Sequence, residues 1–140
     1  MLALDDYRRL NDLGIWTVRD GVRWHLIERQ PHRYDFWSLI PMLRAAEISG
    51  TQVIWDLFHY GWPDDLDIFT SEFVERFGRF ASAFAHVLKR ETQGRAFICP
   101  VNEISFTSWA GGEVEYLNPF ARHRGFELKV QLVRAPIEAM

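Results

Sequence analysis

The sequence predicts an α/β protein built around a parallel β-sheet. Three stretches with the character of buried strands alternate with stretches of helical hydrophobic spacing, in the order helix, strand, helix, strand, helix, strand, helix. Strands that alternate with helices in this way predict parallel βαβ units. The 140 residues correspond to about one domain, and a charged fraction of 25% with a hydrophobic fraction of 48% is typical of a globular chain rather than a disordered one.

The first half of the chain predicts two helices and two strands. Leucine and tyrosine side chains at helical spacing indicate a first helix over residues 4–13, and a strand-like stretch follows over 15–24. A second helix is expected over about 35–50, where Pro41 fits only if it lies in the first turn. An apolar run over 52–58 predicts the next strand.

The second half predicts a long helix, a third strand and a final helix. Thr70 or Ser71 is expected to cap the long helix. One face of that helix is expected to be buried, because it carries a stripe of apolar residues: Phe73, Phe77, Phe80, Phe84 and Val87. Residues 96–101 predict the third strand, and Asn118–Pro119 is expected to open the last helix. Helical spacing continues to the end of the chain through Phe126, Val130, Val133 and Ile137, and Pro136 is expected to kink this helix.

Strand spacing leaves two α/β architectures open. Val22 and Ile54 are 32 positions apart, and Ile54 and Ile98 are 44 positions apart. A (β/α)8 TIM barrel allots about 31 residues to each unit, so a barrel with one extended loop fits these spacings. A doubly wound sheet fits them as well. No G-x-G-x-x-G sequence and no Walker phosphate loop follows any predicted strand, which argues against a nucleotide-binding sheet.

Composition excludes several classes of partner. A net charge of −3 with an isoelectric point near 5.9 argues against nucleic acid, because binding phosphates needs a concentrated basic face. Cys99 is the only cysteine, and His25, His32, His86 and His123 lack metal-like spacing, so no intrachain disulfide, metal or cofactor is expected. No apolar run predicts a membrane span or a secretory leader. The expected setting is therefore cytoplasmic.

Polar side chains gather where the predicted strands end. Arg19 lies on the first strand, His59 directly follows the second, and Asn102 and Glu103 directly follow the third. In α/β folds, functional sites form at the carboxyl ends of strands, so these four side chains are expected to line one common site. A charged side chain placed there needs a partner, because burying an unpaired charge is unfavourable.

Three stretches resemble the second, third and fourth strands of clan A glycoside hydrolases, especially family 1 β-glucosidases. They are Leu13–Arg19 followed by Trp24, Gly50–Leu66 (GTQVIWDLFHYGWPDDL), and Phe97–Glu103 with its Asn-Glu pair. They occur in the family's order and cover nearly the whole chain. The resemblance implies a partial (β/α)8 TIM barrel, with residues 1–140 forming a single incomplete glycosidase-like domain.

The resemblance also implies roles for individual residues in retaining hydrolysis of a β-glycoside. Glu103 matches the general acid/base, which needs a partly desolvated setting to hold its proton near neutral pH. Asn102 matches the residue that binds the sugar 2-hydroxyl, and His59 matches a sugar-hydroxyl ligand. Arg19 matches the arginine that supports a catalytic carboxylate on a later strand.

The sequence departs from the family pattern at three points. Ile104 stands where proline is usual, and Tyr60 stands where tryptophan is usual. The second carboxylate, expected in a Glu-Asn-Gly context on the seventh strand, has no counterpart, and neither Glu113 nor Glu115 matches a family position. Because retaining hydrolysis needs two carboxylates, the isolated chain is expected to be a fragment without activity.

A second hypothesis follows from these departures: a non-catalytic carbohydrate-binding or interaction module derived from a glycosidase barrel. Six tryptophans suit a sugar site, with Trp62 and Trp109 as candidate aromatic walls. Cys99 is interpreted as a small core residue rather than a nucleophile. Three parallel strands leave open edges, so marginal stability or self-association is expected.

Overall fold

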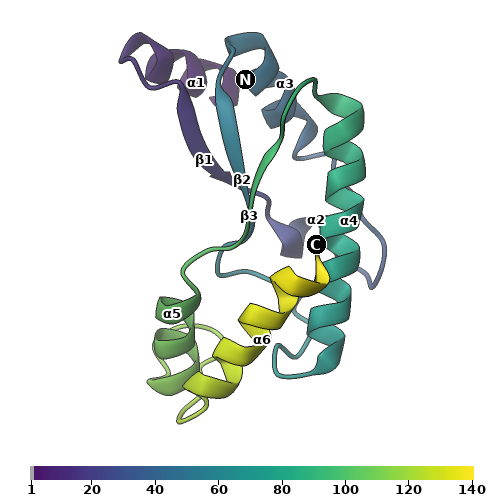
Figure 1. The fold of residues 1–140 in the computed structure, drawn as a ribbon, viewed down its shortest axis with the longest axis vertical. Coiled ribbons are helices and arrows are strands. Elements are labelled where there is room, and N and C mark those ends of the chain that lie inside the picture. Colours follow the sequence, from purple (N-terminus) through teal and green to yellow (C-terminus); the bar gives the residue numbers. More distant parts are fainter. Residues whose placement is uncertain (1) are drawn as a thin grey trace.

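Three parallel strands form the centre of the computed structural model, which describes residues 2–140 (Figure 1). They are β1 (Thr17–Gly21), β2 (Gln52–Phe58) and β3 (Phe97–Val101), in the order β1-β2-β3. Thr17 pairs with Gln52, and Ile54 pairs with Phe97, so all three strands run the same way. The α/β class and the parallel pairing are confirmed. The described residues form an open sheet and not a closed barrel.

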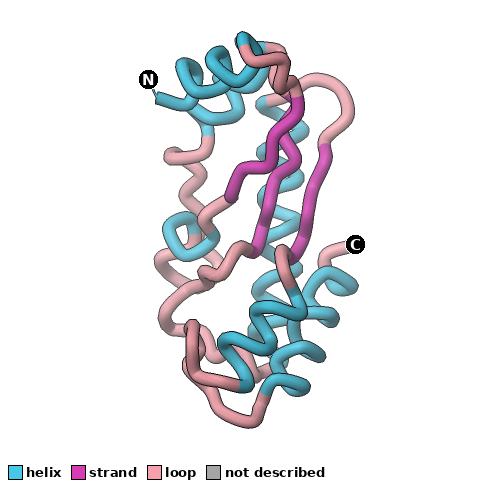
Figure 2. Tube along the Cα trace, turned by 90° about the vertical axis from the view of Figure 1, so that its left-hand side faces the viewer, coloured by secondary structure: helices cyan, strands magenta, loops and turns pink. Residues whose placement is uncertain are grey.

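Helices connect the strands and cover one face of the sheet (Figures 1 and 2). α4 (Ser71–Glu91) runs along this face, where Phe84 packs against Trp55 of β2 with ring centroids 6.4 Å apart. α3 (Ile40–Ser49) joins β1 to β2, and α1 (Leu2–Asp12) packs against α3 near the amino ends of the strands.

The phenylalanine stripe of α4 is buried, as predicted. All five of its members lie in the core: Phe73, Phe77, Phe80, Phe84 and Val87. Trp24 fits into this stripe, with its ring stacked on Phe80 at 5.3 Å and edge-on to Phe77 at 5.5 Å. The core therefore consists largely of aromatic rings between α4 and the segment after β1.

Trp24 itself corrects one strand boundary. β1 ends at Gly21, whereas the sequence pattern extended the strand to Trp24, which instead begins the short helix α2 (Trp24–Ile27). The reason is side-chain pairing: the Trp24 indole Nε1 donates a hydrogen bond to the buried Glu28 carboxylate at 2.6 Å. This i, i+4 contact needs a helical turn.

The ends of α3 and the start of α4 lie at proline, glycine and threonine residues. α3 begins at Ile40, later than the expected start near residue 35, and Pro41 lies in its first turn as predicted. Gly50 ends α3 with a left-handed φ of 69°. Thr70 occupies the cap position of α4, but its hydroxyl donates to the Asp67 carbonyl at 2.7 Å instead of accepting from the helix.

The segment after β3 differs most from prediction. Asn118–Pro119 lies in a loop, and the last helix, α6 (Gly125–Glu138), begins six residues later. Two short helices come first, α5 (Ile104–Thr107) and the π-helix η1 (Ser108–Glu113). The return loop donates backbone N–H groups to the carbonyls of η1, for example from Ala121 to Gly111 at 2.8 Å. Gly111 is required because a Cβ there would lie 2.7 Å from the Asn118 carbonyl oxygen.

α6 has two apolar faces, and only one is covered. Leu128, Leu132 and Ala135 are buried, and α6 packs against α4. The residues whose spacing predicted the helix lie on the exposed side: Phe126, Val130, Val133 and Ile137. Pro136 lies in the last turn of α6. Within residues 2–140, no helix combines the length and apolar character needed to cross a bilayer.

Candidate active site

The candidate site lies at the carboxyl ends of the three strands. Parallel register places Arg19 of β1 beside Ile54 of β2, and Asp56 of β2 beside Cys99 of β3. Successive side chains of a strand alternate between its two faces, so Arg19, Asp56 and Cys99 share the face opposite to Trp55 and α4. The strands therefore present Arg19, Asp56 and Cys99 on one side of the sheet.

Arg19 is the centre of the polar contacts. Its Nη2 donates to Asp56 Oδ1 at 2.6 Å and to Asn102 Oδ1 at 2.6 Å, and its Nε donates to the same Asp56 oxygen at 3.1 Å. The hydrogen bonds to Asp56 raise the pKa of the Arg19 guanidinium above its ordinary value. Arg19 is thus a fixed cation that ties β1 to β2 and to the residue after β3.

His59 completes the group. Its Nε2 lies 3.3 Å from Asn102 Nδ2, and its Nδ1 lies 3.4 Å from Asp56 Oδ2. The structure therefore brings together Arg19, His59 and Asn102, three residues predicted from the sequence.

Asp56 is the member of the group that the sequence interpretation missed. It is only 3% exposed and contacts both Arg19 and His59. The available signal was its position as the one charged residue in the apolar run of β2. A lone carboxylate in a buried strand needs a cationic or hydrogen-bonding partner, and Arg19 supplies one.

Glu103 stands at the rim of this group. It follows β3 by two residues and has left-handed backbone angles, φ 51° and ψ 48°. Tyr60 follows β2 by two residues and is also left-handed, with φ 65°. Burial, and then the negative charge of Glu103, raise the pKa of the Tyr60 hydroxyl. Glu103 itself is exposed, and residues 2–140 do not supply the desolvation that an acid/base residue requires.

Aromatic side chains continue from this rim. Tyr60 meets Phe106 with ring centroids 6.1 Å apart, and Phe106 meets Trp109 at 5.9 Å. Trp109 is 51% exposed, as an aromatic wall would be. The prediction for Trp62 is wrong: it is buried, and its Nε1 donates to the Leu66 carbonyl at 2.9 Å.

Cys99 lies on the site face of β3 rather than in the core where it was predicted. Its Sγ is 3.2 Å from Arg19 Nη2. Burial raises the pKa of the Cys99 thiol, and the negative charge of Asp56 adds to this effect. A raised pKa keeps the group as a thiol at neutral pH, which agrees with the interpretation that it is not a nucleophile.

The remaining carboxylates near the site hold structure in place. Glu113 accepts a hydrogen bond from the Gly125 backbone N–H at 3.2 Å, and Glu115 pairs with Arg122 at 2.8 Å. In residues 2–140, no group of three or more His, Cys, Asp or Glu side chains could hold a metal ion.

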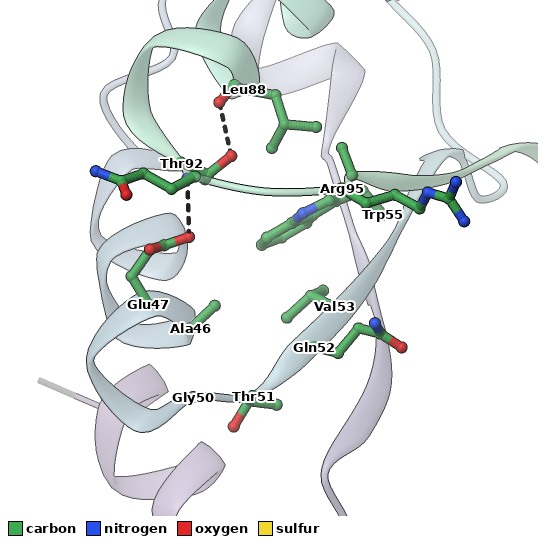
Figure 3. A pocket seen from close by; sticks show the side chains of 12 residues that line it. Ala46, Glu47, Gly50, Thr51, Gln52, Val53, Trp55, Leu88, Thr92 and Arg95 are labelled. Carbon is green, nitrogen blue, oxygen red and sulfur yellow. Dashed lines mark hydrogen bonds between the residues drawn. The ribbon is translucent and has the colours of Figure 1, made fainter.

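A separate hollow of about 260 Å³ lies at the amino ends of β2 and β3 (Figure 3). Its one carboxylate, Glu47, accepts a hydrogen bond from the Gln93 backbone N–H at 3.3 Å. Beside it, the Thr92 hydroxyl donates to the Leu88 carbonyl at 2.7 Å. These polar groups are used by the backbone, so the candidate site is the one at the carboxyl ends.

Comparison with known proteins bears on the fold. The sequence matches no protein-family model and no curated protein. Among solved structures, the chain is similar to a family 1 β-glucosidase from Thermotoga maritima, with a TM-score of 0.85 and 16% identity over 97% of this chain and 32% of that one. A β-glycosidase from Pyrococcus horikoshii gives a TM-score of 0.83 and 17% identity over 96% of this chain and 33% of that one.

The AHE enzyme from Alicyclobacillus herbarius is similar to the same degree, with a TM-score of 0.84 and 17% identity over 97% of this chain and 33% of that one. The chain spans about a third of the length of these proteins. At this identity the likeness concerns the fold, and it agrees with the resemblance seen in the sequence. The chain thus has the fold of one third of a family 1 β-glucosidase.

Proposed function

We propose that residues 1–140 form a single incomplete TIM-barrel domain of a retaining β-glycosidase, carrying the acid/base and part of the sugar-binding site. The observation that carries this proposal is the contact group at the strand ends. Arg19 lies on β1, and His59 and Asn102 directly follow β2 and β3. The resemblance assigns these residues to sugar binding and support of catalysis, and they touch directly or through Asp56.

Glu103 is the proposed acid/base. It would protonate the glycosidic oxygen as the bond to the leaving group breaks, and would later take a proton from the attacking water. Asn102 would bind the 2-hydroxyl, a contact that strengthens in the transition state. Arg19 would support the nucleophilic carboxylate of a later strand. That strand and the cover that desolvates Glu103 would come from the remainder of a barrel, so the chain alone is proposed to be inactive.

Replacing Glu103 tests this role. In a protein that joins this chain to the remainder of its barrel, Glu103→Gln is expected to lower the rate of β-glycoside hydrolysis by about 10²- to 10⁴-fold. The loss should be smaller for a dinitrophenyl glycoside than for a methyl glycoside, because an acidic leaving group needs less protonation. Steady-state assays with both substrates measure this difference.

Glu115→Gln is the matched control, since Glu115 is an exposed carboxylate paired with Arg122 in the return loop. Its activity is expected to equal that of the unchanged protein. Full activity of the Glu103→Gln protein, or an equal loss with both leaving groups, contradicts the acid/base assignment.

The alternative function is carbohydrate binding without turnover. It is favoured by the pairing of Arg19 with Asp56, which occupies the arginine within this chain. In this case, titration calorimetry of the chain should show binding of glucose or a related sugar. The protein joined to its barrel should bind equally but release no product from any aryl β-glycoside.

The exposed side of α6 leads to a prediction about association. Val130, Val133 and Ile137 present an apolar stripe, and β3 has an open edge. Unpaired edges and apolar stripes favour self-association at micromolar to millimolar concentrations. Sedimentation velocity of the chain should show an average mass that increases with protein concentration. Val133→Lys should make this increase smaller. A monomer at all concentrations contradicts the prediction.

A further inference from the structure

We propose that Asp56 is a positioning residue of the sugar site. Its carboxylate closes a ring of polar contacts with Arg19, Asn102 and His59, and this ring sets the tautomer of His59. The ring follows from the structure alone, and its consequence for sugar recognition rests on the proposed function.

The donors and acceptors in the ring are determined by Arg19. A guanidinium carries only donors, so the Asn102 atom at 2.6 Å from Arg19 Nη2 must be the amide oxygen. The amide nitrogen of Asn102 then faces His59 Nε2 at 3.3 Å. An amide nitrogen can only donate, and His59 Nε2 must therefore be an unprotonated acceptor.

Asp56 supplies the matching contact on the other side of the imidazole. In a neutral histidine with Nε2 unprotonated, the proton is on Nδ1. That atom lies 3.4 Å from Asp56 Oδ2, and a carboxylate oxygen favours a proton there. The other oxygen of Asp56 accepts from Arg19 Nη2 at 2.6 Å, which closes the ring.

Burial makes Asp56 suited to this role. Its side chain is only 4% exposed, whereas the side chains of Arg19 and His59 are 47% and 45% exposed. A buried group held by two Arg19 donors has little freedom to turn, and it orients the more exposed side chains of Arg19 and His59. The charge of Arg19 offsets the unfavourable burial of the carboxylate.

The ring determines what a sugar would meet. His59 would present the Nε2 lone pair, and Asn102 would present an N–H beside it. One sugar hydroxyl can donate to the first and accept from the second, taking the place of the 3.3 Å contact between them. The site therefore favours a free hydroxyl at this point and should reject a sugar in which that hydroxyl is absent or methylated.

Nitrogen-15 NMR of the 140-residue chain tests the tautomer without any sugar. At about pH 8, where an ordinary histidine is neutral, His59 is expected in the Nδ1–H form. His86 is an internal reference for that form, because its Nδ1 lies 2.8 Å from the Ser82 carbonyl. His59→Gln assigns the His59 signals. Finding His59 in the Nε2–H form in the unchanged chain overturns the proposal.

Asp56→Asn should move His59 toward the Nε2–H form. Asp20→Asn is the matched control, since Asp20 is a β1 carboxylate that accepts a hydrogen bond from Tyr7 instead of the ring. No change of tautomer in Asp56→Asn, with the chain still folded by circular dichroism, also overturns the proposal. If Asp56→Asn does not fold, the tautomer of the unchanged chain alone decides.

A binding measurement separates this inference from the proposed function. If the chain binds methyl β-glucoside in calorimetry, Asp56→Asn is expected to weaken that binding about tenfold, as for loss of one charge-assisted hydrogen bond. Equal affinity of the two proteins overturns the positioning role. Absence of any sugar binding by the chain joined to the remainder of its barrel, with the Nδ1–H tautomer present, contradicts the proposed function and leaves the ring intact.

Discussion

Replacing Arg76 with methionine is expected to lower the free energy of unfolding by about 3–5 kcal/mol, because it leaves a buried charge without its partner. Arg76 of α4 has a side chain only 1% exposed, and its Nε lies 3.2 Å from Oε1 of Glu28, which is 0% exposed. Glu28 in turn accepts the Trp24 indole N–H, so the pair connects α4 to the segment after β1. Urea denaturation of the chain measures the change.

A surface arginine provides the control. Arg90→Met removes the ion pair between Arg90 and Glu91, in which Arg90 is 69% exposed, and the expected change is below about 1 kcal/mol. Adding Glu28→Gln to Arg76→Met should recover part of the loss, because the double variant no longer buries a charge. Equal effects of Arg76→Met and Arg90→Met contradict the prediction.

Acid tests a second contact of Arg76, the one with Asp65. A hydrogen bond from Arg76 lowers the pKa of Asp65 below its ordinary value. A lowered folded-state pKa contributes stability above the unfolded value of about 3.9, and this stability is lost as the pH falls through the folded value. Because Asp65 is half-exposed, the contribution is small. Arg76→Met should remove this part of the pH dependence.

Phe80→Ala is expected to lower the free energy of unfolding by about 3–5 kcal/mol, the usual range for a buried phenylalanine. Phe80 is 0% exposed and stacks on Trp24 at 5.3 Å and on Phe36 at 6.4 Å. Truncation would open a cavity between two rings that α4 cannot fill by a small shift.

The control for this variant is Phe126→Ala, since Phe126 of α6 is 83% exposed. Its effect on a dilute sample is expected to stay within about 0.5 kcal/mol. Denaturant titrations at equal concentration compare the two variants. If both lose the same stability, the aromatic stripe of α4 is not the centre of the core.

Elements with strong periodicity could be predicted from the sequence. The bounds of β2 agree with the apolar run over 52–58, and the stripe of α4 is buried. Gly50 ends α3 with the left-handed conformation that glycine adopts without strain. These features depend on residues near one another in the chain, so a local pattern is sufficient to predict them.

Features that depend on distant partners could not be predicted. Asp56 meets Arg19 across 37 positions, and Arg76 meets Glu28 across 48. The π-helix η1 depends on a loop that returns to its carbonyls, which a helical period does not indicate. The spacing in α6 predicted the helix correctly, but the residues that carried the pattern lie on its exposed side. Spacing alone does not determine which face of a helix a neighbouring helix covers.

The parallel strand order has a consequence for how the chain folds. Pairing β1 with β2 closes a loop of 35 residues, and pairing β2 with β3 closes one of 43, a difference of about 0.2 kcal/mol in closure entropy. Chain closure therefore does not decide which pair forms first. The partners of the connecting helices are more informative: α4 buries nine residues, and its aromatic stripe packs against Trp24 of the segment after β1. The core of the β2–α4–β3 unit is therefore incomplete until the segment after β1 has packed on α4, so the three strands are expected to assemble in one cooperative step.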